Sequence, residues 1–222
     1  MHTLPLPLWE RVRVIRIMFL TSNSAYQIIA VWMPLFVFAV FFASAVGAYI
    51  WRPKRLNKIL KWGIGFFIIA YLVRSGYLVW LQYVVWQEDK FGAFLLPPNQ
   101  PISYFLQYVW THFLMDLPWI FGGALILFGI VLVLGIVSKG RMVDSTDAIL
   151  ALFGALIAGW PNMLAYFLIV LVLALASSLV YGIIKKQIIL IPITPFFFAG
   201  TIIVFLWGAE ITKILGLGQL AI

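Results

Sequence analysis

The sequence predicts an all-α fold, a polytopic integral membrane bundle of about six to seven transmembrane or membrane-embedded helices. Of its 222 residues, 64% are hydrophobic and only 10% are charged, and the mean hydropathy is +1.08. A soluble domain needs far more polar surface than this. The apolar residues come in long uninterrupted runs, which favours membrane-spanning helices over the short alternating strands of a β-barrel.

The excess of basic residues indicates a membrane orientation. Lys and Arg number 15 against 7 Asp and Glu, which gives a formal net charge of +8. Five of the basic residues fall within the ten-residue gap 52–61, between Trp51 and Trp62. Basic loops between spans lie on the cytoplasmic side, and tryptophans favour the membrane interface. We therefore expect a cytoplasmic loop here and no nucleic-acid partner.

The first part of the chain predicts a lead-in followed by two helices. Residues 1–24 carry three arginines but only a short apolar patch and no clear small-residue cleavage site, so an interfacial or flexible lead-in is expected rather than a cleaved signal peptide. Residues 25–222 are predicted to form a single transmembrane domain. Its first helix covers 25–50, with Pro34 a candidate for a kink. The second covers 62–86.

The middle and end of the chain predict a proline-rich loop and further helices. The run Pro97-Pro98-Asn99-Gln100-Pro101 predicts a loop over 87–101. The apolar stretch 102–115 is short for a span, and Asp116-Leu117-Pro118 is expected to end it before a clean span at 119–137. A short helix at 148–159, a span at 163–184 and a last helix at 195–215 complete the bundle. Small residues repeat at every fourth position in two of these helices (Ala151, Ala155 and Gly159; Ala174, Ser178 and Gly182), which indicates tight packing within the chain.

Asp147 is the leading candidate for a functional residue. A carboxylate beside a membrane segment is costly to bury, so it is usually paired, neutralised or catalytic. A capping role is equally open, with Asp144 or Ser145 as the helix cap and Asp147 in the first turn. Asp89, at the end of the second span, is the other candidate acid or else a solvated charge. Two carboxylates brought close share a proton and activate water without a metal or cofactor.

Three other polar residues are candidates for lesser roles. Arg74 and Glu210 are expected to be buried charges with a structural role, Arg74 pairing with Asp116 or Glu210 or binding a lipid phosphate. The chain has no cysteine, and His112 without a second histidine nearby is a weak metal candidate. No metal site is therefore predicted.

Residues 119–215 resemble the type IV prepilin and preflagellin peptidases, and residues 80–101 resemble them more loosely. The family's signature is a Gly-x-Gly-Asp turn that opens a helix ending in a glycine twelve residues later, and Asp147 and Gly159 fit that spacing. The segment Ile191-Pro192-Ile193-Thr194-Pro195-Phe196-Phe197 looks like the family's closing Ile-Pro-Phe-Gly-Pro-Phe segment.

The resemblance implies a membrane-embedded aspartic endopeptidase, a multi-pass protein of the prokaryotic inner membrane. Its partners would be membrane lipids and a pilin-like precursor, whose basic leader it would cleave at the cytoplasmic face. Asp147 would be one catalytic aspartate and Asp89 the other, with Asp116 as a fallback. Asp144, Ser145 and Thr146 would form the supporting turn. No cofactor is implied, and the oligomeric state is left open.

Two further interpretations stay open. Asp144 and Thr146 replace both glycines of the signature, which points to a catalytically silent relative that serves as a membrane scaffold or assembly partner. A weaker resemblance of Phe121-Gly122-Gly123 and Gly159-Trp160-Pro161-Asn162 points to prolipoprotein diacylglyceryl transferases, without the histidine and arginine those enzymes use at these positions.

The basic loops also set a condition for the peptidase. If the basic stretches at 52–61, 139–141 and 185–186 are all cytoplasmic, Asp89 and Asp147 lie on opposite faces of the membrane unless 102–115 spans and the second helix is re-entrant or broken.

Overall fold

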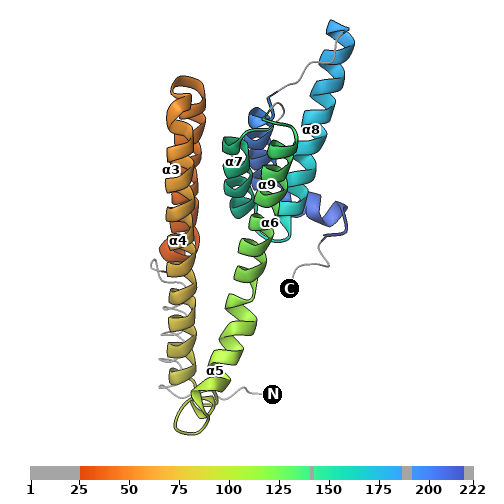
Figure 1. Ribbon diagram of the computed structural model, residues 1–222. Helices are drawn as coiled ribbons and strands as arrows, with labels where there is room; N and C mark the ends of the chain where they lie inside the picture. The colour runs from red at the N-terminus through yellow and green to blue at the C-terminus, as the bar shows by residue number, and fades with distance from the viewer. Residues whose placement is uncertain (1–25, 141–142, 187–191, 218–222) are drawn as a thin grey trace, which may run out of the picture. The chain divides into compact units, whose positions relative to one another are not determined.

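The computed structural model describes residues 26–140, 143–186 and 192–217, and these residues form helices joined by turns, with no β-strand among them (Figure 1). The elements are η1 (Gln27–Trp32), α3 (Met33–Trp51), α4 (Pro53–Glu88), η2 (Gly92–Leu95), α5 (Ile102–Val109), η3 (Trp110–Leu114), α6 (Asp116–Val137), α7 (Ser145–Ala158), α8 (Asn162–Lys185) and α9 (Thr194–Ile214). Of these, η1 and η3 are π-helical and η2 is a 3₁₀-helix. The predicted lead-in, residues 1–24, lies outside the described residues.

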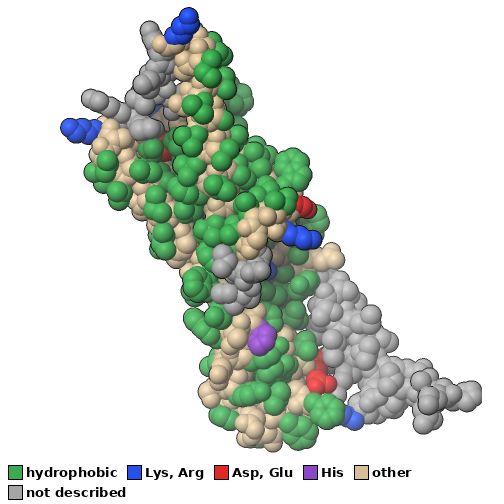
Figure 2. Space-filling view, turned by 90° about the vertical axis from the view of Figure 1, so that its right-hand side faces the viewer, with side chains coloured by type: hydrophobic (Ala, Val, Ile, Leu, Met, Phe, Trp, Pro, Cys, Tyr) green, Lys and Arg blue, Asp and Glu red, His purple; other side chains and the backbone are tan. Residues whose placement is uncertain are grey.

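Five helical stretches are long and apolar enough to cross a membrane: Gln27–Trp51, Pro53–Glu88, Asp116–Val137, Asn162–Lys185 and Thr194–Ile214. Their surfaces fit this setting, since the face shown in Figure 2 is covered mostly by hydrophobic side chains. The all-α fold is confirmed, and the chain is a multi-pass membrane protein. Helix α7 has 14 residues and is about 21 Å long, too short to span the ~30 Å hydrocarbon core.

The basic gap at 52–61 is not the loop that the sequence predicted. Helix α3 ends at Trp51 and α4 begins at Pro53, so most of the basic residues lie on the first turns of a 36-residue helix. Proline is well accommodated at a first helical position, because its fixed φ suits the helix and its missing N–H has no partner there anyway. The residues after it are compatible with a helix, and α4 therefore starts nine residues before the predicted 62.

The sequence predicted that Asp116-Leu117-Pro118 separates two helices and that the next span begins at residue 119, which is three residues too late. Helix α6 begins at Asp116, which places Pro118 in its first turn, where no intrahelical N–H bond is lost. Before it, α5 and η3 together cover the stretch that the sequence predicted at 102–115. The predicted loop at 87–101 contains η2 and a cis bond between Pro97 and Pro98.

The chain divides into two compact units, Met1–Ala39 with Phe66–Leu114 and Val40–Gly65 with Met115–Ile222. In the first unit, Leu96, Phe105 and Val109 form a buried cluster. The partly buried hydrophobic residues packed against that cluster are Val79, Tyr83, Trp86, Tyr108, Phe113 and Leu114.

The second unit is built around α7, which packs against α6, α8 and α9 (Figure 1). Phe153 of α7 is 1% exposed and packs against α4, where a Cβ on Gly63 would lie 3.0 Å from its Cε2 atom. Ala151 and Ala155 are fully buried, as their small-residue stripe predicted. The second predicted stripe is not buried, because Ser178 is exposed on α8.

Candidate functional site

The turn before α7 places Asp144 at the start of that helix. After α6 the chain turns through Lys139 (φ 53°) and Gly140 (φ 71°), both left-handed. Val143 is then buried, and Asp144 has an extended backbone with φ −107° and ψ 177°. This is the conformation of a helix N-cap, whose side chain is free to turn back onto the first N–H groups of the helix.

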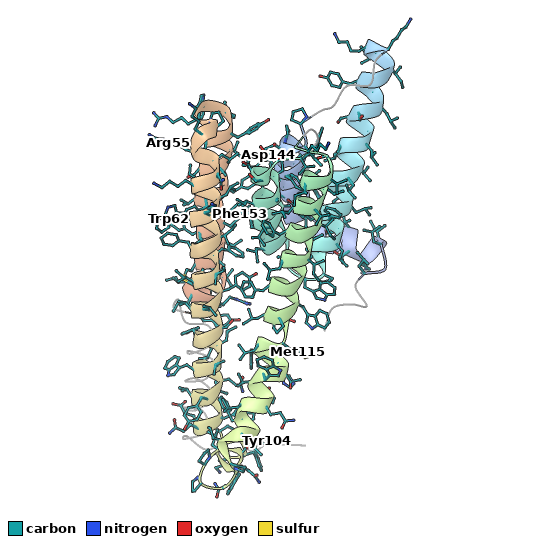
Figure 3. All side chains as sticks on the ribbon, viewed as in Figure 1. Arg55, Trp62, Tyr104, Met115, Asp144 and Phe153 are labelled. Atoms are coloured by element: carbon teal, nitrogen blue, oxygen red, sulfur yellow. The ribbon has the colours of Figure 1, made fainter. Side chains whose placement is uncertain are left out.

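Asp144 and Asp147 form a reciprocal capping box (Figure 3 labels Asp144). Oδ1 of Asp144 accepts hydrogen bonds from the backbone N–H groups of Thr146 at 2.7 Å and Asp147 at 2.9 Å. In return, Oδ2 of Asp147 accepts a hydrogen bond from the backbone N–H of Asp144 at 3.0 Å. Both carboxylates therefore satisfy N–H groups that a helix start leaves without intrahelical partners.

Asp147 also joins α7 to α9. The hydroxyl of Thr194, the first residue of α9, donates to Oδ1 of Asp147 at 2.6 Å. The Asp147 side chain is 4% exposed, so this bond is made in a largely dry place, where losing a partner is costly. Asp147 thus connects the first turns of two helices through a bond between residues 47 positions apart in the chain.

Burial raises the pKa of the Asp147 carboxyl above its ordinary value, and the hydrogen bonds from Thr194 and from the Asp144 backbone oppose that rise. The neighbouring carboxylate of Asp144 adds a smaller rise in the pKa of Asp147. A carboxyl group with a raised pKa in an enclosed place is a candidate acid or base, although structural networks shift pKa values as well.

The raised pKa of Asp147 predicts a pH-dependent stability. Since its folded-state pKa lies above the unfolded value near 3.9, its contribution to stability is complete below that value and is lost as the pH rises through the folded-state pKa. The free energy of unfolding of the wild type should therefore fall relative to that of Asp147→Asn as the pH rises from 4. The free energy of unfolding should fall by about 1.4 kcal/mol for each unit by which the folded-state pKa of Asp147 exceeds its unfolded-state pKa. Thermal unfolding of both proteins in detergent micelles between pH 4 and 8 measures the difference, and parallel curves would contradict the prediction.

Asp89 holds a local turn at the end of α4. Its Oδ2 accepts hydrogen bonds from the backbone N–H groups of Phe91 at 3.0 Å and Gly92 at 2.7 Å. Gly92 fits because the backbone passes closely here, and a Cβ on it would lie 2.9 Å from the carbonyl oxygen of Trp86. Asp89 belongs to the first unit and Asp147 to the second. Helix α4, which precedes Asp89, is unbroken, and the pairing of the two aspartates stays a prediction.

The fallback residue Asp116 lies at the far end of α6 from the capping box. It is the first residue of that 22-residue helix and is exposed, where its charge complements the helix dipole. The rise of an α-helix puts it about 30 Å along the axis from the end that leads to α7. Within the second unit, the carboxylate beside Asp147 is therefore that of Asp144.

Arg74 has a backbone partner. Its Nε donates to the carbonyl oxygen of Ala30 in η1 at 3.0 Å. The helix is π-helical around Ala30, and the backbone N–H of Met33 bonds to the carbonyl oxygen of Ile28, five residues earlier. A bond from the guanidinium to a backbone carbonyl is a common solution for a charge within a membrane segment. The predicted burial of Glu210 is wrong: its side chain is exposed on α9.

Sequence reasoning missed two partners of the residues it selected. Thr194 was recognised only as part of the Ile-Pro segment, and its bond to Asp147 depends on how α7 and α9 pack. The bond from Arg74 to the carbonyl of Ala30 likewise depends on how α4 packs against η1. Among the described residues, no group of three or more His, Cys, Asp or Glu side chains is placed to hold a metal ion.

No family model matches the chain, and no curated protein or solved structure matches it. The resemblance to prepilin peptidases therefore rests on its motif residues alone.

Proposed function

We propose that this chain is a membrane scaffold or assembly partner. It would be a relative of the prepilin peptidases in which the aspartate turn caps a helix and connects two helices instead of catalysing cleavage. The observation that carries this proposal is the capping box. Asp144 stands where the signature has its first glycine, and its carboxylate caps α7 with bonds to Thr146 and Asp147. A glycine at that position has no side chain to supply such a cap.

The roles of the neighbouring residues support the same proposal. Asp147 uses one oxygen for the Asp144 backbone and the other for Thr194, and this ties two helices of the second unit. Asp89 uses its carboxylate for the turn after α4. Each of these aspartates has a structural task that accounts for its presence.

Peptidase activity is the second candidate, and the burial of Asp147 favours it. A buried carboxyl with a raised pKa is better suited to general acid–base catalysis than a carboxyl at its ordinary value. In this case the protein would lie in a prokaryotic inner membrane and cleave the basic leader of a pilin-like precursor, with Asp147 and Asp89 activating water.

Asp147→Asn and Asp147→Leu, compared with the wild type, separate the two candidates. The full chain in detergent micelles is incubated with a pilin-like precursor, and its thermal unfolding is measured in parallel. If Asp147 has only a structural role, the folded wild type leaves the precursor uncleaved. Asp147→Leu then unfolds more easily, by about 1–3 kcal/mol, because it leaves the Thr194 hydroxyl and the Asp144 N–H without their acceptor. Asp147→Asn keeps one amide oxygen and should lose less.

Cleavage by the wild type that Asp147→Asn abolishes, while the variant stays folded, would overturn the scaffold proposal and establish the peptidase. Glu210→Gln is the matched control, since it removes a negative charge from an exposed position on α9 that is not a candidate catalytic residue.

A further inference from the structure

The first turns of α4 present a basic face with a pocket. Lys54, Lys58 and Lys61 are exposed, and together with Asn57 and Trp62 they line a pocket of about 560 Å³. Residues three and four apart lie on the same side of a helix. The three ammonium groups therefore follow one another along about 10 Å of the helix axis.

The surroundings of this face add positive charge and an apolar wall. The segment 40–65 contains five basic residues and no Asp or Glu. Arg52 and Arg55 line a second pocket of about 220 Å³, whose other lining residues are Ser44, Gly47, Ala48, Trp51 and Ile59. Figure 3 shows Arg55 and Trp62 along α4. An anionic group with an attached hydrocarbon chain would fit here, because the anion matches the positive charge and the chain matches the apolar wall.

Two tryptophans indicate the depth of this face in the membrane. Trp51 is 78% exposed and Trp62 is 58% exposed, and they flank the basic residues where a candidate span begins. Exposed tryptophans favour the headgroup level of a bilayer. The lysines are thus placed where lipid phosphates lie, and clusters of Lys and Arg beside a span attract anionic lipids.

Asn57 adds a requirement for a hydrogen-bond donor. Its Oδ1 atom is buried and has no hydrogen-bond partner among the described residues. A buried acceptor without a partner costs free energy, and an amide oxygen needs a hydroxyl or N–H group. The glycerol headgroup of phosphatidylglycerol carries hydroxyl groups next to its phosphate.

We propose that Lys54, Asn57, Lys58, Lys61 and Trp62 bind the headgroup of an anionic phospholipid with hydroxyl groups, of the phosphatidylglycerol type. The lysine ammonium groups contact the phosphate, and the Asn57 side chain turns into the pocket so that its amide oxygen accepts a hydrogen bond from a headgroup hydroxyl. The lipid site does not involve Asp144 or Asp147, so the proposal of this site does not depend on whether the protein is a scaffold or a peptidase.

Lipid binding to the full chain tests this proposal. The protein is purified in detergent and titrated with dioleoyl phosphatidylglycerol, dioleoyl phosphatidic acid or dioleoyl phosphatidylcholine, and bound lipids are counted by mass spectrometry under non-denaturing conditions. The wild type should bind one phosphatidylglycerol at least about tenfold more tightly than phosphatidylcholine. Each lysine replaced by glutamine should weaken this binding about fivefold, and Lys54→Gln/Lys58→Gln/Lys61→Gln should abolish the preference.

The matched control is Lys139→Gln/Lys185→Gln/Lys186→Gln, which removes the same charge elsewhere and should keep the preference. Equal losses in the two triple variants would overturn the site in favour of a general charge effect. Displacement of the lipid by millimolar glycerol 3-phosphate would show a soluble phosphate-ester site instead. The wild type should also bind phosphatidylglycerol more tightly than phosphatidic acid, which has no glycerol headgroup. Asn57→Leu should remove that preference, and an unchanged preference would overturn the role of Asn57.

Discussion

Gly154→Ala should destabilise the second unit more than any other single methyl group added to its helices. Gly154 lies on α7, and a Cβ there would collide with the hydroxyl group of Tyr166 and lie 2.8 Å from Oγ1 of Thr201. Tyr166 is fully buried on α8, so its ring has no solvent to move into. Overpacking of this kind costs about 1–3 kcal/mol, more than the ~1 kcal/mol that alanine gains over glycine within a helix.

Thermal unfolding of the full chain in detergent micelles, followed by circular dichroism, measures this loss. Gly122→Ala on α6 is the matched control, because no atom beyond the adjoining backbone of α6 lies within 4 Å of its added Cβ, and it should be neutral or stabilising. In a Tyr166→Leu background the cost of Gly154→Ala should fall by at least about 1 kcal/mol, since the colliding ring is gone. Equal costs in the two backgrounds would show that Tyr166 is not what limits the space.

The same contact shows why the helices were predictable and their packing was not. Runs of apolar residues predicted the spans from Met163 and from Pro195 to within about one residue, because length and hydropathy alone decide whether a helix crosses a membrane. A close approach between helices is at Gly154, next to Tyr166 and Thr201, whereas the sequence selected the stripe ending at Gly159. Spacing within one helix does not tell which neighbour's side chain it will meet, and Gly159 instead ends α7 with φ 67°.

The candidate site was predictable to a similar degree. A capping role for Asp144 and Asp147 follows from their spacing and from the helix that comes after them, and the structure confirms that role. The partner from α9 depends on tertiary packing between residues 47 positions apart, for which no local pattern exists. The basic gap was misinterpreted because polar residues between two apolar runs look like a loop, while Pro53 allows a helix to begin directly.

Arg74 and Pro34 should be energetically coupled through the Ala30 carbonyl. Arg74→Met removes the bond to Ala30 and also removes a charge that is costly within a membrane segment, so its net effect on stability does not measure the bond. Pro34→Ala supplies an N–H four residues after Ala30, and once the π-helical turn adopts the α-helical register this group bonds to the Ala30 carbonyl in place of the guanidinium. Arg74→Met should therefore cost about 1–3 kcal/mol more with Pro34 present than with alanine there, the penalty of leaving one buried acceptor unpaired.

A double-mutant cycle on thermal or denaturant unfolding measures that coupling directly, because the charge term is common to both backgrounds and cancels. The control cycle combines Pro34→Ala with Arg55→Met, which removes an exposed arginine near the start of α4, and its coupling should be near zero. Coupling below about 0.5 kcal/mol for Arg74, within ordinary additivity, would mean that the π-helical turns of η1 satisfy the Ala30 carbonyl without the guanidinium. Arg74 would then stand in the membrane segment for another reason.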